Sequence, residues 1–247
     1  MAQDSLAKGQ GVCDIVFLLD ISGSMKPCLD GLVDNIQNFI NWLQEGPDAN
    51  RPIVISDWRI KVCGYRNNES DGSLWWVEHP FVANDSDAAK ANLASLEAKG
   101  GGDEPECLLD GLWKVCSLGV SEKGAAPDPE KWRHRHEAVR IVIVFTDATY
   151  KPTCLIPEAS GATSEDIKNK ITEMKLCLSM FAPDEQEYYD LGEIDKFEIE
   201  FIPGILGDPQ MMIDYTADKA KFAKTMEYLA IGCKGRIPAN PFLQYSS

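Results

Sequence analysis

The chain has 247 residues, of which 44% are hydrophobic and 26% are charged, and its formal net charge at pH 7 is −15. These values are typical of one globular domain and exclude collagen, wholesale disorder and a bundle of membrane-spanning helices. The acidic balance argues against nucleic acid or an anionic membrane as a partner, because such binding uses Lys and Arg contacts to phosphate. It fits a cation, a basic partner or simply an acidic surface.

Eight cysteines are spread along the chain without the paired spacings of a disulfide framework or a zinc site. They lie at positions 13, 28, 63, 107, 116, 154, 177 and 233. We therefore expect buried free thiols in a reducing compartment. The first residues, MAQDSLAKGQG, are polar and lack the apolar core of a signal peptide, so we expect a cytoplasmic protein.

The first elements expected are a strand, a short loop and a long helix. Residues 12–19 form an apolar run broken only by Asp14, which predicts a strand buried on both faces, as in a parallel sheet. A loop of small residues follows over 20–24. Apolar side chains then recur at spacings of three and four from Leu29 to Leu43, which predicts an amphipathic helix.

A hairpin and two further helices are expected next. Residues 58–65 and 74–82 are rich in β-forming residues and predict an antiparallel hairpin on a longer loop. An Ala- and Leu-rich helix over 85–99 should stop at the three glycines 100–102. Another helix is expected over 105–118, with its proline in the first turn.

The rest of the chain continues the alternation. A polar stretch over 119–137 predicts a surface insertion, and the apolar run 138–145 predicts a second buried strand. A helix is expected from Ser164, with Leu178 as the last residue of its core stripe. The other segments expected are an exposed acidic stretch over 184–195, strands over 197–203 and 211–215, a helix over 218–230 and an irregular tail over 233–247.

Strands that alternate with helices predict a doubly wound, Rossmann-like α/β fold. We expect a mostly parallel sheet with one antiparallel edge strand, helices on both faces, and a single domain whose core spans about residues 11–232. Such folds bind ligands outside the carboxyl ends of the strands, where the strand order reverses. Two of the expected strands end in carboxylates, at Asp20 and Asp147.

Oxygen ligands gather around the first of these strand ends. The pattern D-x-S-x-S at Asp20, Ser22 and Ser24 puts three hard donors on one tight loop, with a glycine between the serines. Mg²⁺ or Mn²⁺ takes about six oxygen ligands in octahedral geometry. Asp147 could add another carboxylate, so the sequence predicts a divalent-metal site here.

Three segments together resemble a von Willebrand factor type A domain with its metal-ion-dependent adhesion site. They are VFLLDISGSM, GGGDEPE followed by a helix, and IVIVFTDA, in the order and spacing of that family. The resemblance implies that the hydroxyls of Ser22 and Ser24 bind the metal directly and that Asp20 and Asp147 hold it mainly through bound waters. A carboxylate of a partner protein would take the last coordination position. Ca²⁺ is less favoured than Mg²⁺ or Mn²⁺, because the loop is short and hydroxyl ligands suit a small octahedral ion.

The second segment departs from the common pattern of the family. Many members carry Thr after the glycines, where this chain has Asp103. A further carboxylate would raise the affinity for a cation but reduce the positive charge left to attract an acidic partner. Asp103 is therefore a candidate metal ligand or, equally, an acid at a helix N-terminus. Glu104 and Glu106 offer further acidic oxygens near the site, but they are interpreted as first-turn helix acids rather than ligands.

Simpler interpretations compete with the metal site. Ser22 or Ser24 could cap the following helix, and Asp147 could be only a polar strand end. The enzyme motifs that begin with a similar strand and loop fail on their required residues. An aspartic protease needs Gly directly after Asp-Thr, a haloacid dehalogenase-type phosphatase needs a second Asp at position 22, and a dinucleotide site needs G-x-G-x-x-G.

We therefore expect a non-enzymatic module that binds a protein partner in a divalent-metal-dependent way. The alternatives are a metal-dependent hydrolase that uses the same carboxylates, for which the sequence offers no obvious general base, and a scaffold subunit with a degenerate metal site. The partner is unidentified; by analogy with intracellular members of the family, it would belong to a multiprotein assembly.

Overall fold

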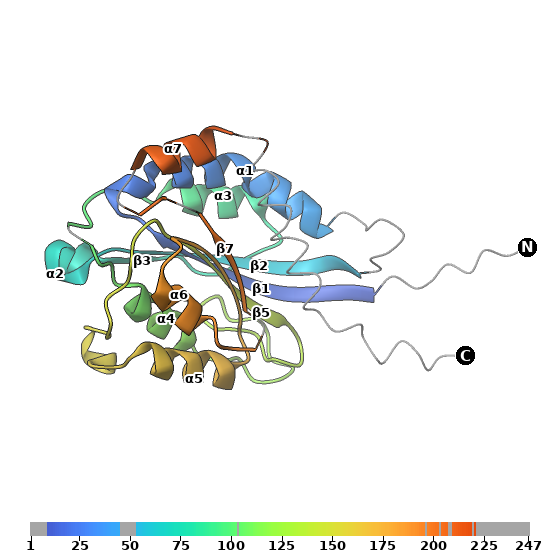
Figure 1. Ribbon diagram of the computed structural model, residues 1–247. Coiled ribbons are helices and arrows are strands. Elements are labelled where there is room, and N and C mark those ends of the chain that lie inside the picture. Colours follow the sequence, from blue (N-terminus) through green and yellow to red (C-terminus); the bar gives the residue numbers. More distant parts are fainter. Residues whose placement is uncertain are drawn as a thin grey trace, which may run out of the picture.

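The computed structural model describes residues 9–44, 53–102, 104–195, 197–202, 204–206, 209–218 and 220. In this part of the chain a mixed sheet of seven strands lies between two layers of helices (Figure 1). The predicted α/β class with a mostly parallel sheet is thus confirmed. The predicted tail over 233–247 and almost all of the helix predicted over 218–230 lie outside the described residues.

The sheet has the strand order β3-β2-β1-β5-β6-β7, and β4 pairs with β2 beside this path. The strands are β1 (Gly9–Asp20), β2 (Ile53–Tyr65), β3 (Trp76–Glu78), β4 (Val82–Ala83), β5 (Val139–Phe145), β6 (Cys177–Ala182) and β7 (Phe197–Phe201). Neighbours from β2 to β7 pair in parallel, whereas β3 and β4 pair antiparallel with β2, as the predicted hairpin requires. The chain moves outward from β1 on one side and from β5 on the other, so the strand order reverses between these two strands.

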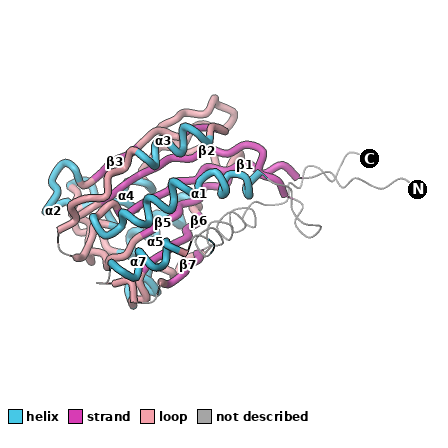
Figure 2. Tube along the Cα trace, turned by 90° about the horizontal axis from the view of Figure 1, so that it is seen from above, coloured by secondary structure: helices cyan, strands magenta, loops and turns pink. Residues whose placement is uncertain are grey.

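Helices cover both faces of the sheet. They are α1 (Lys26–Gln44), α2 (Asn68–Asp71), α3 (Ser86–Ala94), α4 (Leu108–Cys116), α5 (Ser164–Met174), α6 (Gln186–Leu191) and α7 (Pro209–Ala217). Figure 1 shows α1, α3 and α7 on one face and α4, α5 and α6 on the other, and the view from above in Figure 2 looks onto α1, α3 and α7. None of the described helices is both long enough and apolar enough to cross a bilayer.

The central strand β1 supplies side chains to both cores, which explains its continuous apolar sequence. Ile15, Phe17 and Leu19 belong to the core under α1, and Val16 and Leu18 belong to the core under α4. All five side chains are fully buried. A strand covered on both faces has no solvent-facing positions, so its sequence does not alternate between apolar and polar residues.

The prediction that Leu178 continues the core stripe of the preceding helix is wrong. α5 ends at Met174, because Lys175 takes a left-handed conformation with φ of 53° at the helix C-cap. Leu178 lies in β6, whose residues 177–182 are all buried. A short apolar run is compatible with the period of a helix or of a strand, so the hydrophobic pattern alone could not separate the two.

Two predicted helices have different bounds. α3 ends at Ala94 rather than at Lys99, and α4 begins at Leu108 rather than at Pro105. Residues 104–107 therefore precede the helix and lie between the glycines 100–102 and α4. This shift changes the role of the acidic residues in that segment, as described below.

Two C-terminal predictions also need correction. Residues 211–215 lie in the helix α7 and not in a strand. The acidic stretch over 184–195 is not wholly exposed, because α6 lies within it and buries the side chains of Tyr188 and Leu191. In both segments tertiary packing outweighs the local preference read from the sequence.

The cysteines of the described residues are buried, as predicted. Those at positions 28, 63, 107, 116 and 154 are free thiols. Cys233 lies outside the described residues. Burial without a bridge is the usual state of a cysteine that serves as a small apolar side chain.

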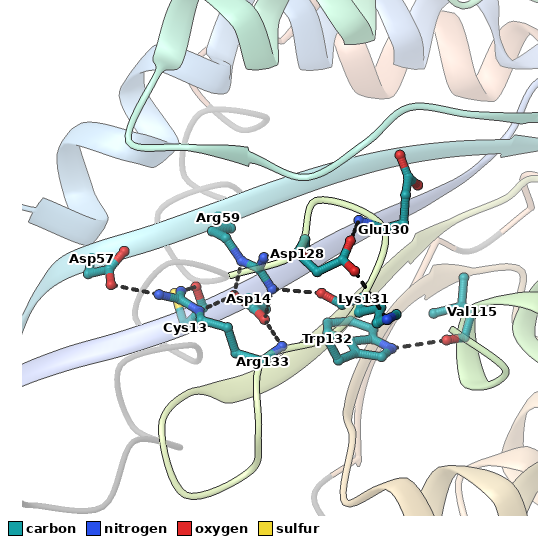
Figure 3. A network of polar contacts seen from close by, with 10 residues as sticks. All are labelled: Cys13, Asp14, Asp57, Arg59, Val115, Asp128, Glu130, Lys131, Trp132 and Arg133. Carbon is teal, nitrogen blue, oxygen red and sulfur yellow. Dashed lines mark hydrogen bonds and ion pairs between the residues drawn. The ribbon is translucent and has the colours of Figure 1, made fainter. Parts of the chain in front are cut away.

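A buried ionic network fastens the insertion 119–137 to the sheet (Figure 3). Asp14, the one charged residue in the apolar run of β1, is fully buried. It accepts hydrogen bonds from Arg59 of β2 through Nε (2.8 Å) and Nη2 (2.6 Å), and from Arg133 of the insertion through the backbone N–H (2.8 Å) and Nε (2.7 Å). Trp132, also fully buried, donates from its indole N–H to the Val115 carbonyl of α4 (3.1 Å). The polar insertion therefore has two buried anchors.

Replacing the carboxylate at the centre of this network should be strongly destabilising. In Asp14→Ala, two buried guanidinium groups lose their shared partner, so the free energy of unfolding should fall by about 3–5 kcal/mol. Urea denaturation of the variant and the wild type measures the difference. The matched control is Asp30→Ala, which removes an exposed ion pair to Lys26 (2.8 Å) and should cost about 0–1 kcal/mol. Equal losses in the two variants would contradict the role given to Asp14.

Candidate metal centre

The structure brings the two predicted strand-end carboxylates together. Asp20 is the last residue of β1, and Asp147 lies just beyond the end of β5 at Phe145. Because β1 and β5 pair in parallel, both carboxylates lie at the same edge of the sheet, where the strand order reverses. Their side chains are buried, with exposed fractions of 0% and 5%. This is the place where a doubly wound sheet binds its ligand.

The serine loop folds back onto these carboxylates. The backbone N–H of Ser22 donates to Asp20 Oδ1 (2.8 Å), and the Ser22 and Ser24 hydroxyl oxygens lie 3.2 Å apart. The Ser24 side chain also lies near Asp147, where it opposes the burial that raises the pKa of that carboxyl. Ser22 precedes the 3-10 turn Gly23–Met25 but makes no side-chain capping bond to it. The Ser22 hydroxyl is therefore not used as a helix cap, which was the competing interpretation for this residue.

Thr146 fixes the second oxygen of the buried carboxylate. Its hydroxyl donates to Asp20 Oδ2 (2.9 Å), and the backbone N–H of Ala148 donates to the same hydroxyl (3.2 Å). Both carboxylate oxygens of Asp20 are thus held in place by hydrogen bonds. Thr146 is a positioning residue that the sequence analysis did not single out, although it stands directly before Asp147.

The glycine run 100–102 packs closely against the serine loop and Glu106. Gly101 has φ of +93°, and a Cβ atom on it would come within 2.6 Å of both Ser22 Cβ and Glu106 Oε1. The Gly23 N–H also donates to the Gly100 carbonyl (3.3 Å). Only glycine allows the backbone to pass this close between two side chains in this conformation.

Glu106 lies at the site, although the sequence analysis assigned it to the first turn of a helix. It is not a first-turn helix acid, because α4 begins at Leu108. Its backbone pairs in a strand-like way with the segment after β5: its N–H donates to the Thr149 carbonyl (2.9 Å), and its carbonyl accepts from the Lys151 N–H (2.9 Å). Its side chain is 3% exposed. The only sequence signal for this position is the preceding glycine run, which indicates a close approach of the backbone to its neighbours.

The other acids of this segment are placed differently. Glu104 is exposed and also precedes α4, so the first-turn interpretation is wrong for it as well. Asp103, the predicted ligand of the second segment, lies outside the described residues. Asp71 of α2 lies close to the glycine run, because its Oδ2 accepts a hydrogen bond from the Gly101 N–H (2.9 Å).

The carboxylates of this edge disfavour one another's ionisation. Burial and then the charge of Asp147 raise the pKa of Asp20 to about 7, and burial raises the pKa of Asp147. Burial and then the charges of Asp20, Asp71 and Asp147 raise the pKa of Glu106 to about 9. Without a cation, the site therefore holds protons on its carboxyl groups above the pH at which they would be released in water.

The donor set fits a small hard cation. Carboxylate and hydroxyl oxygens are the ligands that Mg²⁺ and Mn²⁺ prefer, and a divalent charge would offset the repulsion among the acids. Among the described residues, no group of three or more His, Cys, Asp or Glu side chains is arranged to hold a metal ion. A metal at this edge would therefore depend on the serine hydroxyls as much as on the carboxylates.

Similar proteins were found only among solved structures. The pilus adhesin SpaC from Lactobacillus rhamnosus GG matches with a TM-score of 0.49 and 13% identity, over 90% of this chain and 32% of the adhesin. Proximal thread matrix protein 1 from the mussel byssus matches in two crystal forms with a TM-score of 0.46 and identities of 12% and 13%, over 87% of this chain and 46% or 49% of that protein. This chain thus spans less than half the length of each. No protein-family model and no curated protein matches the chain.

In the absence of metal, the protein should become less stable as the pH rises through the range in which Asp20 titrates. The folded pKa of about 7 lies above the ordinary value of 3.8, so the folded state binds more protons than the unfolded state between these values. The free energy of unfolding then falls with rising pH. Asn at position 20 can keep both hydrogen bonds, because the Thr146 hydroxyl can accept as well as donate. In chelator, Asp20→Asn should gain stability relative to the wild type as the pH rises from 4 to 7.

Thermal melting in chelator across this pH range measures the effect. Each kcal/mol of difference should shift the melting temperature by about 2–4 °C. The control is Asp30→Asn at the exposed ion pair, whose difference from the wild type should not follow the same trend. A constant difference between Asp20→Asn and the wild type from pH 4 to 7 would show that Asp20 is ionised normally in the folded state.

Proposed function

We propose that this chain is a von Willebrand factor type A-like domain that binds a protein partner in a divalent-metal-dependent way. One observation carries the proposal: two buried carboxylates and two serine hydroxyls, whose oxygens lie 3.2 Å apart, meet at the edge where the strand order reverses. Ser22 caps no helix, and a hydroxyl oxygen has two lone pairs, so one that already makes a hydrogen bond can still bind a cation.

The roles follow from the chemistry of the side chains. Ser22 and Ser24 would bind Mg²⁺ or Mn²⁺ through their hydroxyls, and Asp20 and Asp147 would hold it mainly through bound waters. Asp103 stays a candidate for the same ion. When bound, the metal supplies an electrophilic position that a carboxylate of the partner can occupy. The net charge of −15 favours a partner whose carboxylate is surrounded by basic residues, since complementary charge promotes association.

We propose a binding role in preference to catalysis. A metal-dependent hydrolase needs a general base beside the metal, and histidine is the residue most often used. The chain has three histidines. His79 lies 3.0 Å from the Ser95 hydroxyl, and His134 and His136 stack on one another in the insertion. These contacts give the imidazoles other partners, which argues against a histidine base at the metal and for a binding role.

Removing both serine hydroxyls should abolish tight metal binding. Titration calorimetry with Mg²⁺, and Mn²⁺ binding followed by electron paramagnetic resonance, should show an affinity lower by about tenfold or more for the Ser22→Ala, Ser24→Ala double variant, since even outer-shell changes cost about 10–100-fold. The control is Ser95→Ala, which removes an exposed hydroxyl bonded to the Asn92 carbonyl (2.7 Å). Unchanged affinity in the double variant would remove the serines from the site.

The interaction itself needs a separate measurement. Partners captured by the wild-type domain in Mg²⁺ should be lost in chelator and should not be captured by the double variant in either buffer. Ser95→Ala should capture them as the wild type does. Partners that bind equally in chelator and in Mg²⁺ would contradict metal-dependent recognition, even if the ion itself binds.

A further inference from the structure

Arg140 has a buried guanidinium without a hydrogen-bond partner. It is the second residue of β5 and is 4% exposed. In the part of the chain that the structure describes, its side chain makes no hydrogen bond and no ion pair. A guanidinium carries five N–H donors and is always charged at neutral pH, and burying a charge without a partner is costly. A native protein keeps such a group where a ligand completes it or where it has a task.

The carboxylate beside Arg140 cannot serve it, because the hydrogen-bonding positions of this carboxylate are taken. Asp14 pairs with Arg59 of β2 on one side and with Arg140 of β5 on the other. Its Oδ1 accepts hydrogen bonds from Nε of Arg59 and of Arg133, and its Oδ2 accepts from Nη2 of Arg59 and the backbone N–H of Arg133 (Figure 3). An ionised carboxylate has about four acceptor sites, and these bonds occupy all of them.

The other two arginines of this network are fully engaged. Arg59 also donates to two backbone carbonyls of the insertion, so each of its guanidinium nitrogens has a partner. Arg133 also donates to the Cys13 carbonyl (2.8 Å) and the Asp57 carboxylate (2.6 Å). Within the described residues, Arg140 thus differs from both in keeping its donors free for a ligand.

The charged groups linked in this way carry an excess of positive charge. Burial lowers the pKa of Arg140, the charge of Asp14 opposes that shift, and the charge of the exposed Arg135 adds to it. Four arginines, at positions 59, 133, 135 and 140, therefore face two aspartates, at positions 14 and 57. Three further acids of the insertion are engaged elsewhere, in contacts of Asp128 with Lys131, Glu130 with Lys61 and Glu137 with the Gly124 N–H. In a chain with a net charge of −15, this is a local excess of two positive charges.

The guanidinium of Arg140 is within reach of a small solute. Its nitrogens are not among the unpaired polar atoms that are sealed from solvent, so the small exposed part of the residue includes the guanidinium. The position is also far from the candidate metal centre. Asp14 precedes Asp20 by six residues of β1, which is roughly 20 Å of strand. A ligand of Arg140 would therefore bind independently of the metal.

We propose that Arg140 and the exposed Arg135 form a binding site for a phosphate-type dianion. The planar fork of a guanidinium matches two phosphate oxygens at once, and such charge-assisted hydrogen bonds are strong. A dianion would balance the excess of two positive charges, whereas chloride or a single carboxylate would balance half of it. Because Arg140 is almost fully buried, the ligand has to be small or to present the phosphate group at its end.

The test measures binding of inorganic phosphate in metal-free chloride buffer at pH 7, by titration calorimetry and by thermal melting. Phosphate should bind the wild type and raise its melting temperature with increasing concentration, because a ligand of the folded state stabilises it. Arg140→Met keeps a long side chain without the charge and should lower the phosphate affinity by about tenfold or more, the worth of one hydrogen bond to a charged group. In chloride it should melt no lower than the wild type, because an unpaired buried charge is removed.

Two further variants and a second ligand sharpen the test. Lys90→Met removes one exposed positive charge of α3 and should bind phosphate as the wild type does. Arg135→Ala changes an exposed residue, so it tests the site without risk to the fold, and it should lower the affinity by about two- to fivefold. Glycerol 3-phosphate distinguishes the sources of the phosphate group. Equal binding supports a site for phosphate on a larger molecule, and binding of inorganic phosphate alone supports a site for the free ion.

The anion site is overturned if phosphate raises the melting temperature of the wild type no more than sodium chloride does at the same ionic strength. It is also overturned if Arg140→Met binds phosphate as tightly as the wild type, because the ion would then bind elsewhere. A lower melting temperature of Arg140→Met in chloride, with no phosphate binding by the wild type, would make Arg140 a structural residue only. The Ser22→Ala, Ser24→Ala double variant should bind phosphate normally, which keeps this test apart from that of the metal centre.

Discussion

The parallel pairing of β1 with β5 is the interaction on which the rest of the site depends. The register that pairs Leu19 with Phe145 brings Asp20 and the residues after β5 to one edge of the sheet, although they are far apart in the sequence. Apolar contacts on both faces drive this pairing, because both strands are buried almost throughout. The like charges at the strand ends oppose it. The free energy gained by burying the apolar side chains therefore outweighs the repulsion between the acids. A bound cation would relieve that repulsion, so the repulsion favours cation binding.

The arrangement around Asp20 shows how a fold can hold a carboxylate in a position where its ionised form is unfavourable. Its two oxygens receive hydrogen bonds from Ser22 and Thr146, which lower its pKa, yet burial and Asp147 outweigh them. The hydrogen bonds orient the carboxylate, but its pKa stays raised, so it still tends to bind a proton or a cation. Strain of this kind persists only where the surrounding structure determines the geometry, and it is commonly concentrated at functional sites.

Local pattern was enough to predict the parts of the molecule that depend on short stretches of sequence. The buried strands, the helix from Lys26 to Gln44 and the strand-end acids Asp20 and Asp147 follow from periodicity and from the rule for parallel sheets. Glu106 could not be found in this way. Its role depends on where α4 begins and on pairing with residues 149–151, and both are decided by tertiary contacts. The same limit applies to β6 and to the burial of Trp132 and Arg133.

Asp14 affects the register in which β1 pairs with its neighbours as well as the stability of the fold. Successive side chains of a strand point to opposite faces, so a slip of β1 by one residue would exchange its two apolar faces at little loss of buried area. Aliphatic side chains cannot prevent that error, because β1 is apolar on both sides. A carboxylate that must meet Arg59 and Arg133 can do so in one register only. The ion pair near the start of β1 thus determines which residue reaches the far end of the strand, and it selects the alignment in which that residue is Asp20.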